Sequence, residues 1–247
     1  RLDNSRQRYG LPTYSAHHAK VDAMATAELF LEVPMSTVRY TFEYIQDALH
    51  AVGVCEGGIV FVTSDLGRVP GFEQPSKAAI LKAYLQALHD VIGPRGTIIV
   101  PTASLYLCNT DIPCNLAETP SQNIGVSSEF VRKQPGALRS FHPFVSYTAL
   151  GATARDIIEN VSRHSYGPNT PEERLVEMGA RSVSLGLYPR LSGSTVHQVE
   201  TAALVPYRYV KEYMHPIHRD GDIIREAFYQ YVLYLDSDIK RDYGKQL

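Results

Sequence analysis

A histidine and a glutamate stand three positions apart in the segment SGSTVHQVE, which runs from Ser192 to Glu200. Residues with this spacing lie on one face of a helix, so His197 and Glu200 can interact there. The hydroxyl residues before His197 can cap that helix. The dipole at a helix N-terminus disfavours the charged imidazole, which leaves the ring able to accept a proton. The pattern fits a general base with a carboxylate partner, and it also fits a structural histidine–glutamate contact.

Other polar residues follow segments that are typical of buried strands. Thr63 and Ser64 end the segment GGIVFVTS, and Thr102 and Ser104 follow GTIIVP. In open α/β sheets, ligands bind beyond the carboxyl ends of the strands, so we expect these hydroxyls to converge on a cleft. The loop TSDLG can present backbone N–H groups to a phosphate, but an ordinary turn has the same composition. The segment RSFHPFVS can be a hydrogen-bonded loop shaped by Pro143.

Helical and strand patterns alternate along the chain. Amphipathic or capped segments predict helices at 36–54, 75–93, 127–133, 152–162 and 170–179, and from about 194. Apolar runs predict strands at 57–64, 96–104, 145–150 and 182–187, and a late strand at 228–235 on a sheet edge. The alternation predicts an α/β fold, a three-layer α/β/α sandwich with a mostly parallel central sheet. We predict one domain over residues 35–247, preceded by an extension over residues 1–34 that is a leader or an oligomer contact.

The composition excludes several classes of partner. The 247 residues are 44% hydrophobic and 20% charged, which is enough to bury a core. A net charge of −2 gives no basic field for nucleic acid, and no apolar run is long enough to span a membrane. Three cysteines without metal-type spacing favour a reduced, cytoplasmic compartment and no metal site, although Cys108 and Cys114 can pair or act as nucleophiles. A homodimer is a further possibility.

Several motifs in this order resemble one enzyme family. The segments RSFHPFVS and STVHQVE carry the patterns RS-x-HP-x-x-S and ST-x-H-x-x-E, and matching stretches run from about Ile59 to Glu200. The chain resembles the aminoglycoside 3-N-acetyltransferases, α/β enzymes that move an acetyl group from acetyl-CoA to an amine of a sugar ring. It departs from many relatives at Val62, where they have a histidine, and at Ser192 and Gly193, where they have an acid or an amide.

The resemblance also implies roles for individual residues. His197, Glu200 and His142 are implied to be catalytic. Glu200 either orients the His197 imidazole or binds the ammonium form of the substrate, and His142 is implied to lie near the reacting thioester. Acetyl-CoA or another acyl-CoA is the implied co-substrate, without a metal. The residues implied to hold it are Thr63, Ser64, Asp65, Leu66, Gly67, Thr102, Ser104, Arg139, Ser140 and Ser146.

These roles imply direct transfer of the acyl group. His197 takes a proton from the amine, and donors near Thr102 or Ser140 stabilise the oxyanion. A serine or cysteine acyl-enzyme is the alternative, but no nucleophile stands in a GxSxG elbow.

The sequence contains features that favour different substrates as the acceptor of the acyl group. The loop at 106–120 offers Asp111 and Glu118 to an amine, whereas the basic and aromatic segment at 205–221 offers Arg208 and Lys211 to a phosphate. We therefore expect a nucleotide-linked amino sugar of surface polysaccharide synthesis, with an aminoglycoside as the alternative. The tyrosines of the later segment can equally pack a sheet or a subunit contact. A protein that binds CoA or a sugar without turnover remains a third possibility.

Overall fold

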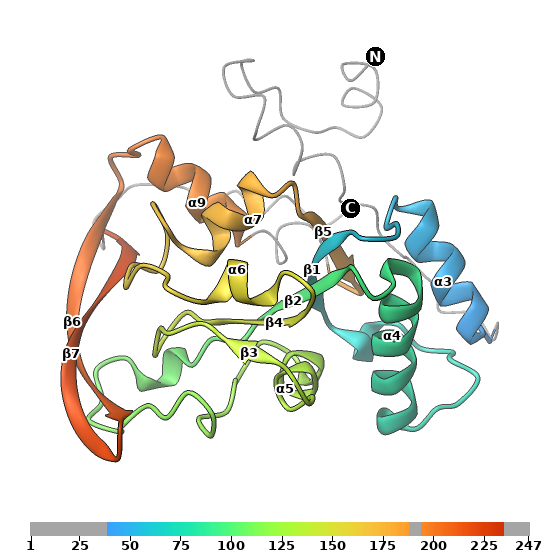
Figure 1. Cartoon of the computed structure of the whole chain (residues 1–247), viewed down its shortest axis with the longest axis horizontal. Coiled ribbons are helices and arrows are strands. Elements are labelled where there is room, and N and C mark those ends of the chain that lie inside the picture. The colour runs from blue at the N-terminus through green and yellow to red at the C-terminus, as the bar shows by residue number, and fades with distance from the viewer. Residues whose placement is uncertain (1–38, 188–193, 235–247) are drawn as a thin grey trace.

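A mixed five-stranded sheet forms the centre of the computed structural model, which describes residues 39–187 and 194–234. The predicted extension at 1–34 lies outside the described residues. The strands are β1 (Ile59–Ser64), β2 (Thr97–Pro101), β3 (Leu138–Arg139), β4 (Tyr147–Gly151) and β5 (Arg181–Leu185), in the order β3-β4-β2-β1-β5 (Figure 1). β1 is parallel to β2 and β5, while β4 is antiparallel to both β2 and β3. Four of the five strands therefore point the same way, which confirms the predicted sheet.

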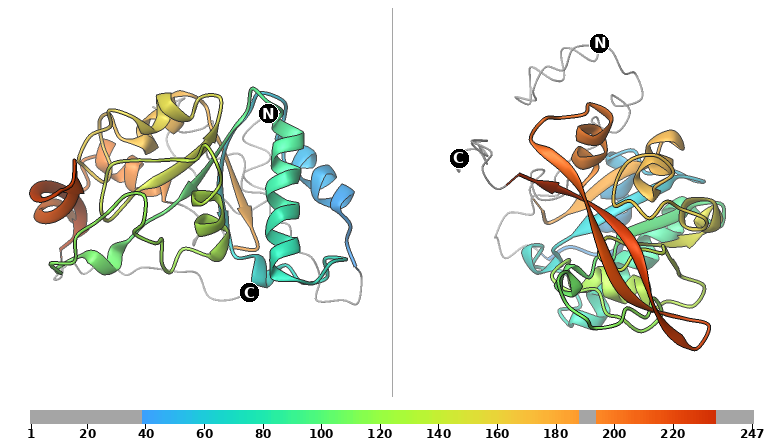
Figure 2. Two further views of the ribbon diagram at one scale, coloured as in Figure 1. Left: turned by 60° about the horizontal axis from the view of Figure 1, so that its bottom comes forward. Right: turned by 90° about the vertical axis from the view of Figure 1, so that its left-hand side faces the viewer.

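Helices cover both faces of this sheet, as Figure 2 shows. Val60 and Val62 of β1 face α3 (Phe42–Ala51) and α4 (Lys77–Ile92), and α5 (Val126–Arg132) completes this layer. Phe61, between those two valines, faces α6 (Ala154–Ile158) and α7 (Pro171–Glu177) on the opposite side. This alternation buries both faces of β1, so the predicted three-layer sandwich is confirmed.

Local capping decides where the helices begin and end. At α4 the Ser76 hydroxyl accepts from Ala79 N at 3.1 Å, and Gly93 ends the helix with φ +64°, as its sequence predicts. The predicted start of α3 at Ser36 is wrong. Thr41 is its N-cap and accepts from Tyr44 N at 3.3 Å, so the helix begins at Phe42.

The C-terminal part of the described chain forms a separate ribbon. β6 (Arg208–Arg219) and β7 (Asp222–Leu233) pair with each other in antiparallel register, so the predicted late strand is present and lies in a two-stranded sheet apart from the main sheet. The ribbon lies along one side of the domain (Figures 1 and 2) and packs Ile217 and Phe228 against Phe144. Helix α9 (Thr195–Ala202) precedes it, and two short 3-10 helices, η1 (Leu66–Arg68) and η2 (Leu105–Leu107), follow β1 and β2. Among the described residues, no helix combines the length and the apolarity needed to cross a membrane.

Candidate active site

A cleft of about 640 Å³ opens at the carboxyl ends of β1 and β2. Thr63, Ser64 and Asp65 line it from the end of β1, and Ser146 lines it from the segment before β4. These four predicted site residues are therefore brought together where the sheet topology places a ligand. The remaining lining residues are Pro101, Ala103, Leu105, Tyr106, Gln122, Asn123, Ile124, Gly125, Val145, Tyr147, Tyr166, Leu187 and Ser194.

A second hollow of about 410 Å³ adjoins the cleft, because Asp65 and Gly125 line both. Leu66 and Gly67, predicted to bind CoA, lie here beside Lys77 at the start of α4. The Asp65 carboxylate accepts a hydrogen bond from Arg68 Nε at 3.0 Å. The loop after β1 therefore separates two adjoining concave surfaces, one of which carries a lysine.

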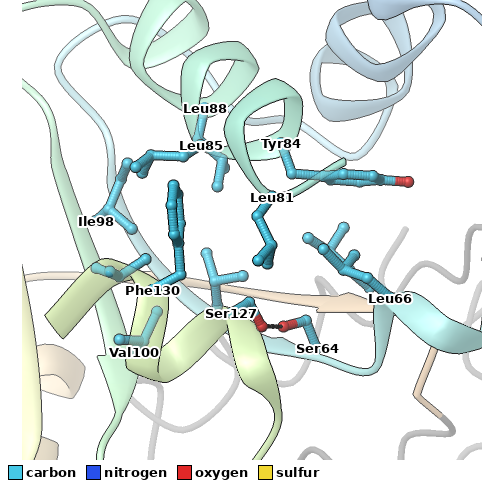
Figure 3. A pocket seen from close by; sticks show the side chains of 13 residues that line it. Ser64, Leu66, Leu81, Tyr84, Leu85, Leu88, Ile98, Val100, Ser127 and Phe130 are labelled. Carbon is cyan, nitrogen blue, oxygen red and sulfur yellow. Dashed lines mark hydrogen bonds between the residues drawn. The ribbon is translucent and has the colours of Figure 1, made fainter. Parts of the chain in front are cut away.

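The loop end of β1 is fixed from behind by apolar packing. Figure 3 shows the Ser64 hydroxyl bound to that of Ser127 on α5, at the rim of a cavity lined by side chains such as Leu81 and Phe130. The cavity has a volume of only about 20 Å³, so it is a packing defect rather than a ligand site. The Ser64 hydroxyl is thus bound to protein, whereas the Thr63 hydroxyl has a longer contact, at 3.4 Å from that of Ser184.

The imidazole of His197 contacts Glu200 as its spacing predicts. Nδ1 lies 2.8 Å from the Glu200 carboxylate, which can only accept, so Nδ1 donates, and in the neutral ring the lone pair is on Nε2. Glu200 also accepts from the Tyr207 hydroxyl at 3.1 Å and forms an ion pair with Arg208 Nε at 2.7 Å. The side chain of His197 is 32% exposed, and its ring lies edge-on to Tyr166, a cleft residue, with centroids 5.1 Å apart. His197 therefore stands one aromatic ring away from the cleft.

Arg139 does not line the cleft, but its hydrogen bonds hold two segments that do. Its guanidinium donates to Ser146 Oγ and Ser104 Oγ, both at 2.8 Å, and to the carbonyl oxygens of Thr102, Leu116 and Thr119. These acceptors are neutral, and burial lowers the pKa of Arg139. The guanidinium thus links the segment after β2 to the segment before β4, and both segments contribute residues that line the cleft.

The groups predicted to stabilise the oxyanion already form hydrogen bonds with neighbouring strand segments. Thr102 N donates to Ser146 O, and Ser140 N donates to Tyr147 O, both at 2.8 Å. The Ser140 hydroxyl accepts from Tyr147 N at 2.9 Å, and both Thr102 and Ser140 are buried. Neither residue lines the cleft, so their groups hold strands in place and do not face a reacting carbonyl.

His142 is buried beside the ribbon and does not reach the cleft. Its Nδ1 accepts from Phe144 N at 3.2 Å and from Val145 N at 3.1 Å, and its ring meets those of Phe144 and Phe228 edge-on. Burial lowers the pKa of His142 to about 3, so the ring is neutral at physiological pH. The structure gives it the contacts of a core residue that shapes the turn before β4.

Glu172 on α7 carries a buried carboxylate next to the cleft, and it was not among the predicted site residues. Its Oε1 accepts from the hydroxyls of Tyr147 at 2.8 Å and Ser194 at 2.7 Å, and its Oε2 accepts from the Thr195 hydroxyl at 3.2 Å. One signal could have found it. Glu172 stands three positions before the buried Leu175, so both lie on the face of α7 that packs on the sheet.

Comparison with known proteins identifies the family. The family model described as aminoglycoside 3-N-acetyltransferase matches residues 61–245, which include the cleft loop, the Glu172 helix and α9. The chain belongs to the aminoglycoside 3-N-acetyltransferase family. Aminoglycoside N(3)-acetyltransferase VII of Streptomyces paromomycinus is 34% identical over 167 residues, which is 60% of this chain and 57% of that protein. The chain thus spans somewhat more than half the length of this relative.

Solved structures of aminoglycoside acetyltransferases share the fold. The complex of AAC-IIIb with CoASH has a TM-score of 0.69 at 24% identity, covering 78% of this chain and 76% of that one. A mutant of aminoglycoside acetyltransferase AAC(3)-IVa in complex with a gentamicin has a TM-score of 0.64 at 25% identity, covering 79% and 72%. The family fold expected from the sequence motifs is confirmed.

The residues expected to select the acceptor lie away from the cleft of this family member. Asp111 is exposed and paired with Arg225, and Glu118 is also exposed. Lys211 on β6 lies over the Tyr213 ring at 4.7 Å, and Arg208 is bound to Glu200. None of these four lines the cleft, and they do not form one site. The expectation of a nucleotide-linked sugar rested on the second pair, and the family comparison supports the aminoglycoside alternative instead.

Two further expectations concern cysteines and metals. Cys108 and Cys114 are both free, and burial raises the pKa of each thiol, so neither has the character of an activated nucleophile. Within residues 39–187 and 194–234, no cluster of three or more histidine, cysteine or acidic side chains is arranged to hold a metal ion.

Proposed function

We propose that the protein is an acetyl-CoA-dependent N-acetyltransferase that acetylates an amine of an aminoglycoside. The observation that carries this proposal is the His197–Glu200 pair, held beside the cleft at the carboxyl ends of the strands in a member of this family. An imidazole whose Nδ1 proton is held by a carboxylate presents a basic Nε2, which is what deprotonation of an ammonium requires.

The cleft and the adjoining hollow together fit an elongated acyl-CoA. Thr63 lines the cleft with a hydroxyl, and Leu105 and Val145 offer apolar surface, which suits the mixed polarity of a pantetheine arm. Lys77 in the adjoining hollow supplies a positive charge for a phosphate. Bound there, acetyl-CoA would supply the activated acyl group as a thioester.

His197 performs the proton transfer in this proposal. An ammonium group first gives one proton to Nε2, which releases it to solvent. The neutral amine then attacks, Nε2 takes a second proton as the nitrogen–carbon bond forms and the carbon–sulfur bond breaks, and that proton passes to the departing thiolate. Glu200 holds the tautomer and the ring orientation, while Arg208 and Tyr207 fix Glu200 itself. General-base assistance of this kind contributes roughly 10²–10⁴ in rate.

An aminoglycoside fits the site better than a nucleotide-linked sugar. The arginine that would meet a phosphate, Arg208, is only 12% exposed and bound to Glu200. A related acetyltransferase of the same fold was solved in complex with a gentamicin. Gentamicin is therefore the acceptor of choice for a direct test.

The test measures thiol release from acetyl-CoA with gentamicin and, separately, with dTDP- and UDP-linked amino sugars. We expect release with gentamicin. Release with a nucleotide-linked sugar alone would reject the aminoglycoside assignment. Measurable CoA binding without thiol release from any amine would favour a binding protein without turnover.

The role of His197 is tested by substitution. We expect His197→Ala to lower the rate by more than about a hundredfold, because the general base is lost, while CoA binding by calorimetry stays unchanged. The exposed His50 on α3 provides a matched control, and His50→Ala is expected to keep the wild-type rate. A His197→Ala rate close to that of the wild type would remove this residue from the mechanism.

A further inference from the structure

Three hydroxyl groups from two elements point their protons at one buried carboxylate. Glu172 has no measurable exposure and accepts from Tyr147 of β4 and from Ser194 and Thr195 at the start of α9. Burial raises the pKa of Glu172, and the three hydroxyl bonds oppose this rise. The hydrogen-bond partners that surround this carboxylate in the described part of the chain are therefore neutral donors.

The number of protons fixes the direction of these hydrogen bonds. Each hydroxyl carries a single proton, and those of Tyr147 and Ser194 are committed to Glu172. Both of these residues line the cleft, and so does Tyr166. The oxygen atoms of Tyr147 and Ser194 can therefore offer a ligand lone pairs, but no protons.

We propose that Tyr147 and Ser194, with their protons drawn inward by Glu172, form with the adjacent Tyr166 the subsite that receives an ammonium group of the acceptor. A protonated amine is a donor without an acceptor, so it complements oxygen atoms that only accept. Tyr166 also contacts the ring of His197, which places the subsite next to the base that must remove a proton from that amine. Glu172 is a residue that determines specificity through two others, because it is buried and touches no ligand itself.

Two features of α9 agree with this role. The start of a helix carries a partial positive charge that would repel an ammonium, and the Glu172 carboxylate at Ser194 and Thr195 offsets it. Ser194, the N-cap residue, makes no side-chain capping bond, because its hydroxyl is turned to Glu172 instead. Ser194 therefore contributes a hydrogen bond to Glu172 in place of the usual helix cap.

The inference rests on the proposed function for the identity of the amine, but its test measures binding without turnover. Gentamicin binding to the full chain is measured by calorimetry in Glu172→Gln, Tyr166→Phe and Ser194→Ala, with CoA binding measured in parallel. The glutamine removes the charge and introduces donors, so the hydroxyl protons are no longer all drawn inward. We expect about tenfold or greater loss of gentamicin affinity in Glu172→Gln and Tyr166→Phe, with CoA affinity within about twofold of the wild type.

Glu177→Gln is the matched control, since Glu177 is exposed at the end of the same helix and loses the same charge. It is expected to bind gentamicin as the wild type does. An unchanged gentamicin affinity in both Glu172→Gln and Tyr166→Phe overturns the subsite, as does a wild-type chain that does not bind gentamicin. If gentamicin binds and Glu172→Gln weakens it, but no acetyl group is transferred, the subsite stands and the proposed enzyme fails. Tyr166→Phe keeps the aromatic contact with His197, so it tests the oxygen even if Glu172→Gln folds poorly.

Discussion

Polar side chains in this protein have different roles, because their hydrogen-bond partners differ. The half-buried Arg139 donates to neutral oxygens and links strands, whereas the buried Glu172 accepts hydroxyl protons beside the cleft. His142 accepts backbone N–H groups and remains neutral, whereas His197 on a partly exposed helix is paired with a carboxylate. The same residue types therefore differ in role because burial and hydrogen-bond partners differ.

At the residue scale, His142 makes the fold sensitive to acid. Its pKa is about 3 in the folded protein and has an ordinary value of 6.5 when solvated, so between these values the unfolded chain binds more protons. Stability is therefore lost as the pH falls below about 6.5, by about 3 kcal/mol between pH 7 and pH 4 from this residue. We expect urea unfolding at several pH values to show a shallower loss in His142→Asn than in the wild type. The exposed His50→Asn should follow the wild type, and an equally steep loss in His142→Asn would contradict the assignment.

At the scale of elements, α9 is held mainly by polar contacts. Gln198 is its buried residue, and the carboxamide oxygen accepts from Gly167 N at 2.8 Å. Glu172 holds the start of the helix, and Arg208 of β6 holds Glu200 on its last turn. The position of His197 therefore depends on hydrogen bonds from the segment around α7 and on an ion pair from the ribbon, more than on apolar packing.

Gln198→Leu tests this arrangement. Leucine has a similar size, but it leaves the buried Gly167 N–H without its partner, which costs about 1–3 kcal/mol. We expect urea unfolding to show that loss of stability and acetyl transfer to fall with it, because α9 carries His197. Val196→Ala, on the half-exposed face of the same helix, should change stability by less than about 0.5 kcal/mol. Equal stability of Gln198→Leu and the wild type would show that other contacts position α9.

Elements determined by local sequence were predicted well, and those determined by distant contacts were not. β1 and α4 follow from an apolar run and from the caps Ser76 and Gly93, which act within a few residues. The contact of His197 with Glu200 follows from helical spacing alone. Glu172 is buried, and Arg139 donates its hydrogen bonds, through contacts with residues that are distant in the sequence. Composition and spacing could therefore not predict either feature. The pairing of β7 with β6 instead of the sheet likewise depends on Phe144 and its neighbours.

At the scale of the whole molecule, the β6–β7 ribbon connects the site to the rest of the domain. Its middle exchanges backbone hydrogen bonds with Cys114 on one edge and with the segment at Arg163–Ser165 on the other. Its first residue, Arg208, is paired with Glu200 beside His197. A two-stranded ribbon is marginally stable alone, so its apolar contact with the domain must hold it in place. That contact centres on Phe228, whose ring lies between those of Phe141, His142 and Phe144.

Phe228→Ala should therefore affect both stability and the distant catalytic pair. Removing a fully buried phenylalanine costs about 3–5 kcal/mol, and a loosened ribbon also releases Arg208 from Glu200. We expect urea unfolding to show a large loss of stability. At temperatures where the variant remains folded, we expect a lower rate of acetyl transfer. CoA affinity should be retained, because the loops proposed to bind CoA lie on the main sheet. Ile223→Ala near the ribbon turn, where the side chain is 57% exposed, should leave both quantities unchanged. A Phe228→Ala variant that loses stability but keeps the full rate would show that the ribbon supports the fold without controlling the His197–Glu200 pair.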